Sequence, residues 1–128
     1  MIEKDGVPED SIQMESYHCM HPTFLKVQLE ESLKRLNLEC LDVLYLQNPY
    51  EAHGPYNTDN VFYDRLSAAF EFLESMVEQE KIKQYGIATY SSLRVKPTNL
   101  KMHLNLQKVA RTAQKVVGEN KKHNFTFV

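Results

Sequence analysis

Residues 41–46 form a short apolar run, L-D-V-L-Y-L, that limits the folds open to this sequence. The run is short enough for a strand, contains the β-formers Val43 and Tyr45, and is apolar at nearly every position rather than at alternate ones. This pattern is typical of a parallel strand that lies between helices and is covered on both faces. The run therefore favours an α/β fold.

A helical pattern precedes this run. Leucines spaced by four, four and three residues form one apolar stripe, namely Leu25, Leu29, Leu33 and Leu36. Charged residues lie off the stripe, as expected for an amphipathic helix. We expect this helix to begin at His21 or Pro22 and to end at Asn37.

A second amphipathic helix is expected at about residues 61–80, with Asp59 or Asn60 as its N-cap. Its apolar face would contain Phe62, Leu66, Ala69, Phe70, Leu73 and Val77. Residues 49–60, which are rich in proline, glycine and asparagine, are predicted to form a loop between the run and this helix. At about a dozen residues this loop is long, and long loops often carry function.

The pattern then repeats. A second strand is expected at residues 85–90, followed by a polar connection at residues 91–104. A third helix is indicated by the stripe Leu106, Val109, Ala110, Ala113, Val116 and Val117. Gly118 would cap the third helix, and residues 125–128 are prone to form a strand.

Three helices and three strands in alternation are the mark of right-handed β/α units on a parallel sheet. Residues 1–21 have no sustained period and are expected to form an irregular N-terminal arm, ahead of a β/α domain at residues 22–128. A sheet of three strands leaves both of its edges unpaired. We therefore expect that the chain either pairs with a second copy or is a piece of a larger domain.

The composition excludes several classes of protein. Lys and Arg number 15 against 17 Asp and Glu, so the formal charge is −2 and no nucleic-acid partner is predicted. No apolar run approaches the ~18 residues needed to span a bilayer, so no membrane association is predicted. The acidic first residues lack the apolar core of a signal peptide, and a cytoplasmic location is expected. Cys19 and Cys40 are then expected to be reduced.

A metal site is the one chemical motif suggested by local spacing. His18, Cys19 and His21 form an H-C-x-H pattern, but the sequence has no second cluster at the spacing of a zinc site. No metal is therefore predicted.

Several longer stretches resemble the middle of an aldo-keto reductase, in the same order and at the same spacing as in that family. They read HCMHPTFL, EESLKRLNLECLDVLYLQNP, FEFLESMVEQEKIKQYGIATY and FTFV, and they extend from about His18 to the C-terminus. The resemblance implies a (β/α)8 TIM barrel, NADP(H) as the hydride-transferring cofactor, a small carbonyl substrate, and a catalytic Asp, Tyr, Lys and His.

The resemblance covers only part of such a barrel, which typically needs ~250 residues. The strands that bring the catalytic Asp, Tyr and Lys in the family have no counterpart in residues 1–18, and the last strands, which hold the adenosine 2′-phosphate, have none either. The expected fold is therefore a partial (β/α)8 TIM barrel with about three strands and three helices.

Gln47 lies where the family motif usually has His, at the carboxyl end of the first predicted strand, which is the functional end of a β/α barrel. By this resemblance Gln47 is the candidate catalytic residue, with Asn48 and Tyr50 in the substrate loop. A glutamine amide can donate a hydrogen bond to a carbonyl, but it neither titrates nor relays a proton. The pair Gln47 and Asn48 before Pro49 also fits an ordinary strand end followed by a turn.

The second candidate site is G-I-A-T-Y at residues 86–90, where a common family version reads G-V-S-N-F and its Ser and Asn hold the nicotinamide carboxamide. Ala88 and Thr89 occupy those two positions and are the predicted cofactor-binding residues. Thr89 keeps a hydroxyl that can donate and accept, whereas Ala88 keeps no polar group. A related family branch reads G-I-A-T-W.

Two functions follow from these observations. The first is a fragment of an NADP-dependent oxidoreductase for aldehydes or ketones, inactive as this chain alone. The second is a non-catalytic half-barrel that binds a nucleotide or a partner, with self-association through its exposed sheet edges.

Overall fold

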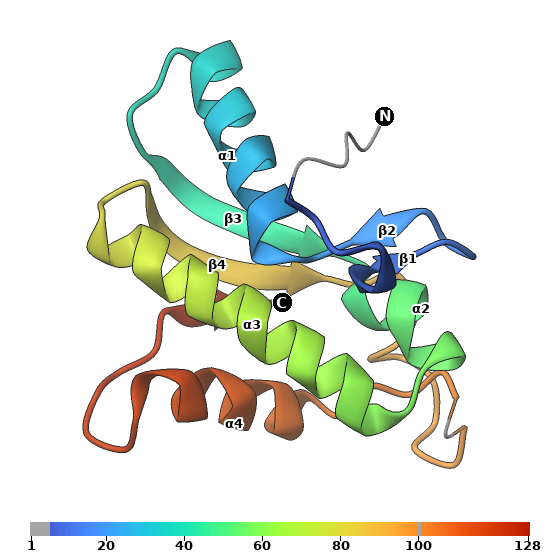
Figure 1. The fold of residues 1–128 in the computed structure, drawn as a ribbon. Coiled ribbons are helices and arrows are strands. Elements are labelled where there is room, and N and C mark those ends of the chain that lie inside the picture. Colours follow the sequence, from blue (N-terminus) through green and yellow to red (C-terminus); the bar gives the residue numbers. More distant parts are fainter. Residues whose placement is uncertain (1–5, 100) are drawn as a thin grey trace.

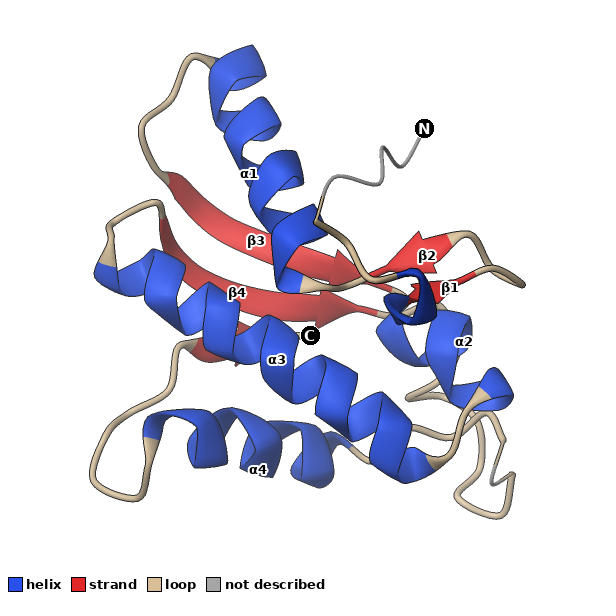
Figure 2. Cartoon of the chain, in the orientation of Figure 1, coloured by secondary structure: helices blue, strands red, loops and turns tan. Residues whose placement is uncertain are grey.

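The computed structural model describes residues 6–99 and 101–128. At its centre is a three-stranded parallel sheet in the order β3 (Leu41–Gln47), β4 (Ile82–Ala88) and β5 (Phe125–Phe127). A layer of helices lies on one side of the sheet and consists of α1 (Pro22–Leu36), α3 (Asp59–Glu78) and α4 (Leu106–Val117) (Figures 1 and 2). The predicted fold class, part of a (β/α)8 TIM barrel, is confirmed, and the described strands form an open sheet rather than a closed barrel.

The ends of α1 and α4 follow the local sequence. The His21 side chain caps α1 by accepting a hydrogen bond from the Thr23 N–H through Nδ1 (3.2 Å). Asn37 ends the same helix in the left-handed conformation, with φ of 55°. For α4, the Asn105 side chain accepts from a backbone N–H in the first turn, and Gly118 follows the last turn. The predicted beginning and end of α1, and the glycine cap of α4, are confirmed.

The loop predicted at residues 49–60 is wrong in part. It contains the short helix α2 (Pro49–His53) and the 3₁₀ turn η2 (Gly54–Tyr56). Pro49 occupies the first helical position, where a fixed φ and a missing N–H favour helix initiation. The prediction of Asp59 or Asn60 as the N-cap of α3 is also wrong. Thr58 is the N-cap, because its hydroxyl accepts from the Val61 N–H (3.3 Å), and the helix begins at Asp59.

Two further segments differ from their predictions. The second strand begins at Ile82 and ends at Ala88, so Tyr90 lies beyond it. Residues 1–21 contain, within their described part, the 3₁₀ turn η1 (Glu9–Ser11) and an antiparallel hairpin of β1 (Ile12–Gln13) and β2 (His18–Cys19). Strands of two residues give no measurable period in the sequence. The domain boundary at residue 22 stays a prediction.

The core lies between the sheet and the helix layer. Phe62, Leu66 and Phe70 of α3 are fully buried, as are Tyr85 and Ile87 of β4. Toward the end of β3 the exposure alternates, since Leu46 is 4% exposed while Tyr45 is 47% exposed and Gln47 is exposed. The helices therefore cover one face of the sheet. The opposite face, which carries Tyr45 and Gln47 and which we call the open face, has no such layer in the part of the chain that the structure describes.

No helix among the described residues has the length and apolar character needed to cross a bilayer.

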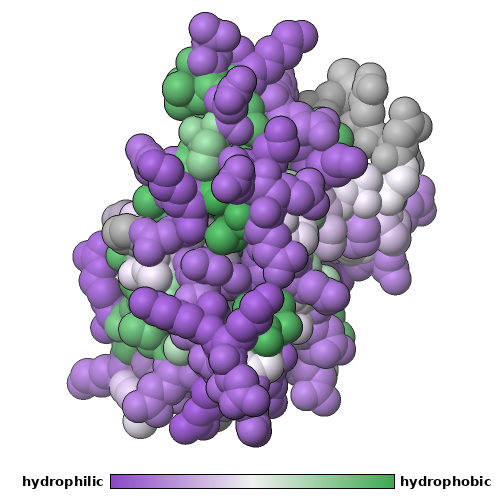
Figure 3. All heavy atoms as spheres, turned by 90° about the vertical axis from the view of Figure 1, so that its left-hand side faces the viewer, coloured by the Kyte–Doolittle hydropathy of each residue, from purple (hydrophilic) through white to green (hydrophobic). Residues whose placement is uncertain are grey.

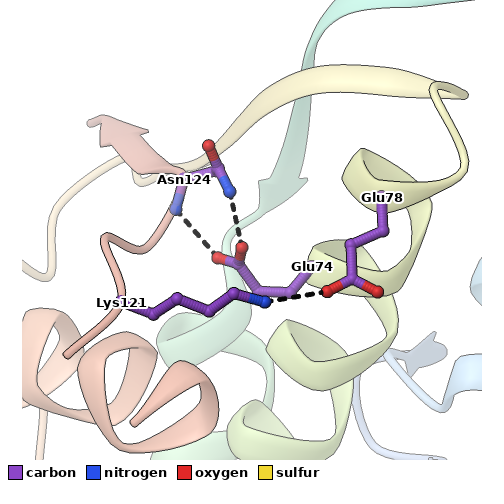
Figure 4. A network of polar contacts seen from close by, with 4 residues as sticks. All are labelled: Glu74, Glu78, Lys121 and Asn124. Atoms are coloured by element: carbon purple, nitrogen blue, oxygen red, sulfur yellow. Dashed lines mark hydrogen bonds and ion pairs between the residues drawn. The ribbon is translucent and has the colours of Figure 1, made fainter. Parts of the chain in front are cut away.

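The short strand β5 is held to the core by one buried carboxylate. Glu74 of α3, which is 8% exposed, accepts hydrogen bonds from the Tyr85 hydroxyl (2.7 Å), the Asn124 backbone N–H (2.8 Å) and the Asn124 side-chain amide (2.7 Å). Figure 4 shows both bonds from Asn124, at the entrance to β5. Burial and Glu74 together raise the pKa of Tyr85 well above its usual value, so its hydroxyl remains a donor. Glu74 thus joins α3, β4 and the entrance to β5.

We predict that Glu74→Gln lowers the free energy of unfolding by about 2 kcal/mol, because an amide nitrogen cannot accept and leaves one buried donor without a partner. Urea unfolding measures this change. The matched control is Glu78→Gln on the same helix, whose partner Lys121 lies at 3.2 Å and whose side chain is 69% exposed (Figure 4). Loss of that exposed ion pair should lower the free energy of unfolding by less than about 1 kcal/mol. Equal effects of the two substitutions would contradict the role given to Glu74.

Candidate functional site at the carboxyl ends of β3 and β4

The carboxyl ends of two neighbouring parallel strands bring the predicted site residues together. Gln47 at the end of β3 is the register partner of Ala88 at the end of β4. The Asn48 N–H extends this pairing by donating to the Ala88 carbonyl oxygen at 2.6 Å. The two sequence positions singled out for the substrate carbonyl and for the cofactor therefore lie side by side.

The side chain of Gln47 lies on the open face. Side chains alternate along a strand, and Leu46 is buried toward the helices, so Gln47 projects to the other side together with Tyr45. Gln47 is exposed at the very end of the strand. Its amide is therefore accessible to a small molecule bound at this end of the sheet.

Asn48 has a structural task in addition to its predicted place in the substrate loop. It takes the left-handed conformation, with φ of 47° and ψ of 48°, which turns the chain from β3 into α2. Its Oδ1 accepts from the Tyr90 N–H at 2.9 Å, and Glu51 Oε2 accepts from the same N–H at 2.9 Å. Asn48 therefore ties the segment that follows β3 to the segment that follows β4.

Ala88 and Thr89 occupy the end of β4 and the residue after it, and both are half-buried. A nicotinamide carboxamide presents one acceptor oxygen and two N–H donors. The Thr89 hydroxyl can satisfy either kind of group, whereas the Ala88 side chain can satisfy neither. Of the two predicted cofactor-binding residues, Thr89 is therefore the one that offers a side-chain hydrogen bond.

Tyr50, the other residue predicted for the substrate loop, follows Asn48 in α2 but has a buried side chain. It is 4% exposed, and its ring packs edge-on against Phe62 at 5.0 Å between centroids. It lines a separate cavity of about 250 Å³ with Tyr63, His103 and Lys108. Its role as a substrate-loop residue stays a prediction.

A chain of hydrogen bonds that the sequence did not indicate ends at the site. Arg65 of α3 lies 2.9 Å from His53 Nδ1 through Nη1, and His53 Nε2 lies 2.8 Å from His18 Nδ1. His18 Nε2 in turn lies 2.8 Å from the backbone oxygen of Gln47. The three side chains come from α3, α2 and β2. We call this set the Arg65–His53–His18 chain.

The direction of each bond in this chain is fixed by its first and last members. A guanidinium only donates, so His53 Nδ1 accepts and His53 carries its proton on Nε2. His53 therefore donates to His18 Nδ1, which leaves the proton of His18 on Nε2. That proton is donated to the Gln47 carbonyl, which can only accept. Both imidazoles are consequently neutral when all hydrogen bonds of the Arg65–His53–His18 chain are formed.

The electrostatic environment favours the same neutral state. Burial, together with the nearby His18 and Arg65, lowers the pKa of His53 from 6.5 to about 4. Burial also lowers the pKa of His18, although its hydrogen bond to Gln47 opposes this shift. His53 is fully buried. The sequence contains no local signal for His53 and Arg65, because they lie 35 and 47 residues from His18 and belong to no local motif.

The residues of the H-C-x-H pattern do not converge. His18 faces His53, His21 caps α1, and Cys19 is buried with a free thiol. Among the described residues no group of three or more His, Cys, Asp or Glu side chains is arranged to hold a metal ion.

The chain is similar to a known protein family. Residues 12–114 match the family model described as the aldo/keto reductase family. The matched range contains the hairpin strands, β3, β4, and every residue of the site described above. No curated protein matches the chain.

We predict that acidification destabilises the folded chain through His53. The unfolded chain binds a proton on this residue near pH 6.5 and the folded chain only near pH 4, so the folded state binds fewer protons in between. The contribution of His53 is complete above pH 6.5 and is lost as the pH falls to 4, by about 3 kcal/mol.

Urea unfolding at several pH values, followed by tyrosine fluorescence, measures this loss. In His53→Gln, which keeps a donor and an acceptor but does not titrate, the decrease between pH 6.5 and 4 should be smaller than in the unsubstituted chain by about that amount. Parallel pH profiles of the two proteins would contradict the assignment.

Proposed function

Because this chain belongs to the aldo/keto reductase family, we propose that it forms part of the catalytic end of an NADP-dependent oxidoreductase that acts on aldehydes or ketones. The observation that carries the proposal is the register of Gln47 with Ala88. It puts a hydrogen-bond donor for a carbonyl oxygen next to the residues assigned to the nicotinamide. Members of the family generally use NADP(H) and act on small carbonyl substrates.

Gln47 would hold the substrate carbonyl. Its amide N–H can donate to the carbonyl oxygen, where negative charge develops during reduction. Unlike the histidine of the family motif, it has no proton to exchange near neutral pH. We therefore assign Gln47 to orientation of the substrate and not to proton transfer.

Thr89 would orient the cofactor. Its hydroxyl follows the strand end directly and can bind the carboxamide of a nicotinamide. NADPH, when bound, supplies the hydride for carbonyl reduction. The task of this chain is then to hold the two reacting groups next to each other, which by itself contributes substantially to a rate.

We predict that the 128-residue chain alone does not reduce aldehydes with NADPH, as measured by NADPH absorbance. A positioned general acid typically contributes ~10² to 10⁴ in rate. By the family resemblance, the Tyr and Lys that act as this acid lie on strands with no counterpart in residues 1–18. Turnover by the chain that is abolished by Tyr45→Phe or Tyr90→Phe would contradict the proposal, because the acid would then lie within this chain.

The positive arm uses a complete family barrel in which residues 12–114 of this chain replace the corresponding segment. This chimera should reduce carbonyls slowly, and Gln47→His should raise its rate by roughly 10²-fold. A chimera that binds NADPH but is insensitive to Gln47→His would contradict the assignment of residue 47.

The uncovered sheet supports a second candidate function, a non-catalytic interaction protein that pairs with another copy or a partner. Among the described strands β3 pairs only with β4, and the open face leaves Tyr45 47% exposed. At ~25 cal/mol per Å², a few hundred Å² of apolar surface left in water forfeits several kcal/mol. By contrast, the end of the molecule where β3 and β4 begin is mostly hydrophilic, with apolar residues in separate small patches (Figure 3).

We predict that the chain self-associates through the open face. Sedimentation velocity should show oligomers that Val43→Lys, a change on the open face, shifts toward monomer. The matched control is Val27→Lys on α1, where the side chain is already 55% exposed, and it should leave the distribution unchanged. A monomeric chain with a sharp, reversible thermal transition would show that the open face needs no cover.

A further inference from the structure

The peptide group between Gln47 and Asn48 is held on both of its sides. Its N–H donates to the Ala88 carbonyl at 2.6 Å, toward β4. Its C=O accepts from His18 Nε2 at 2.8 Å. Both polar groups of this peptide therefore have a partner, and the partners come from different parts of the chain.

The second partner, His18, lies at the edge of β3 that faces away from β4. In a trans peptide the N–H and the C=O point to opposite sides, so a C=O whose N–H faces β4 points to the other edge of β3. Among the described strands β3 pairs only with β4, and no backbone donor comes from that edge. His18 supplies the hydrogen bond that a neighbouring strand would otherwise supply.

His18 is held by contacts to the fully buried His53 and, through it, to Arg65. Its ring meets that of His53 edge-on, with 4.9 Å between centroids and 87° between planes. Arg65 holds His53 from the other side and is itself anchored to Gln13 Oε1 (3.0 Å) and the Asp10 carbonyl (2.7 Å). These bonds leave the His18 ring little freedom to rotate.

The backbone of His53 is held as well. Asn57 donates through Nδ2 to the His53 carbonyl (2.8 Å) and to Gln13 Oε1 (2.6 Å). Hairpin, α2 and α3 thus form one hydrogen-bonded block next to the end of β3 (Figure 1).

We propose that His18, His53 and Arg65 are positioning residues for Gln47. They fix the plane of the peptide that follows Gln47, and with it the direction in which the Gln47 side chain leaves the strand. This inference rests on the proposed function, in which the Gln47 amide meets the substrate carbonyl. None of the three residues contacts the substrate in this proposal, and each acts through the next in the chain.

Amide hydrogen exchange with single-residue resolution tests the proposal on the full chain. The readout is the exchange rate of the Asn48 N–H divided by that of amides in the middle of α4. The division separates local loosening from general destabilisation, which would raise both rates together. In His53→Leu, which removes donor and acceptor, we expect this ratio to rise roughly tenfold. Arg65→Met should give the same result, and Arg35→Met on α1, where the side chain is 76% exposed, is the matched control, with no change.

The second arm of the hydrogen-exchange experiment uses a conservative substitution of His53. His53→Gln keeps one acceptor for Arg65 and one donor for His18, so the ratio should return toward that of the unsubstituted chain. An unchanged ratio in His53→Leu would overturn the proposal, and so would equal ratios in His53→Leu and His53→Gln. The measurement needs neither cofactor nor substrate, so a failure of the turnover experiments and a failure of this inference are distinguishable.

Discussion

The parallel pairing of β3 with β4 determines both the core and the candidate site. It sets Gln47 opposite Ala88, and it points Leu46 and Ile87 to the helix layer. Because side chains alternate, a slip of one residue in β3 would bury Gln47 and expose Leu46. The burial of Leu46 therefore determines that Gln47 is accessible. In this sense the geometry of the candidate site is a consequence of core packing.

Hydrogen bonds fix the positions of the short segments that apolar packing alone does not determine. β5 has three residues and the hairpin strands have two each, too few to dock by burial alone. Glu74 accepts two hydrogen bonds from Asn124 at the entrance to β5 and a third from Tyr85 of β4. The Arg65–His53–His18 chain joins the hairpin to the sheet. Both networks bury a polar side chain that would be costly without its partners. Each therefore specifies one arrangement of a short segment.

The sequence predicted those elements that have a clear period and missed those that depend on distant partners. The stripe of α1 and the run at residues 41–46 were sufficient to predict a helix and a strand, since burial of one helix face or of a whole strand leaves a local pattern. The helix α2 was missed because Pro49 is as common in turns as in the first turn of a helix. At the site, Gln47 and Thr89 are candidates from the family resemblance, and their roles stay predictions. His53 has no local signal, because its partners Arg65 and His18 are recognisable only once the chain has folded.

The distribution of protons at the site determines which chemistry its residues can perform. The titratable groups linked most directly to Gln47 are His18 and His53, and both have lowered pKa values. The Nε2 proton of His18 is already donated to a backbone carbonyl, and its Nδ1 accepts from His53. Gln47 takes the place of the titrating histidine of the family motif. Neither imidazole can therefore supply that titration without breaking the contacts that hold the end of β3. In the proposed function, such a site would bind and orient a carbonyl, and the proton for its reduction would come from a group outside the Arg65–His53–His18 chain.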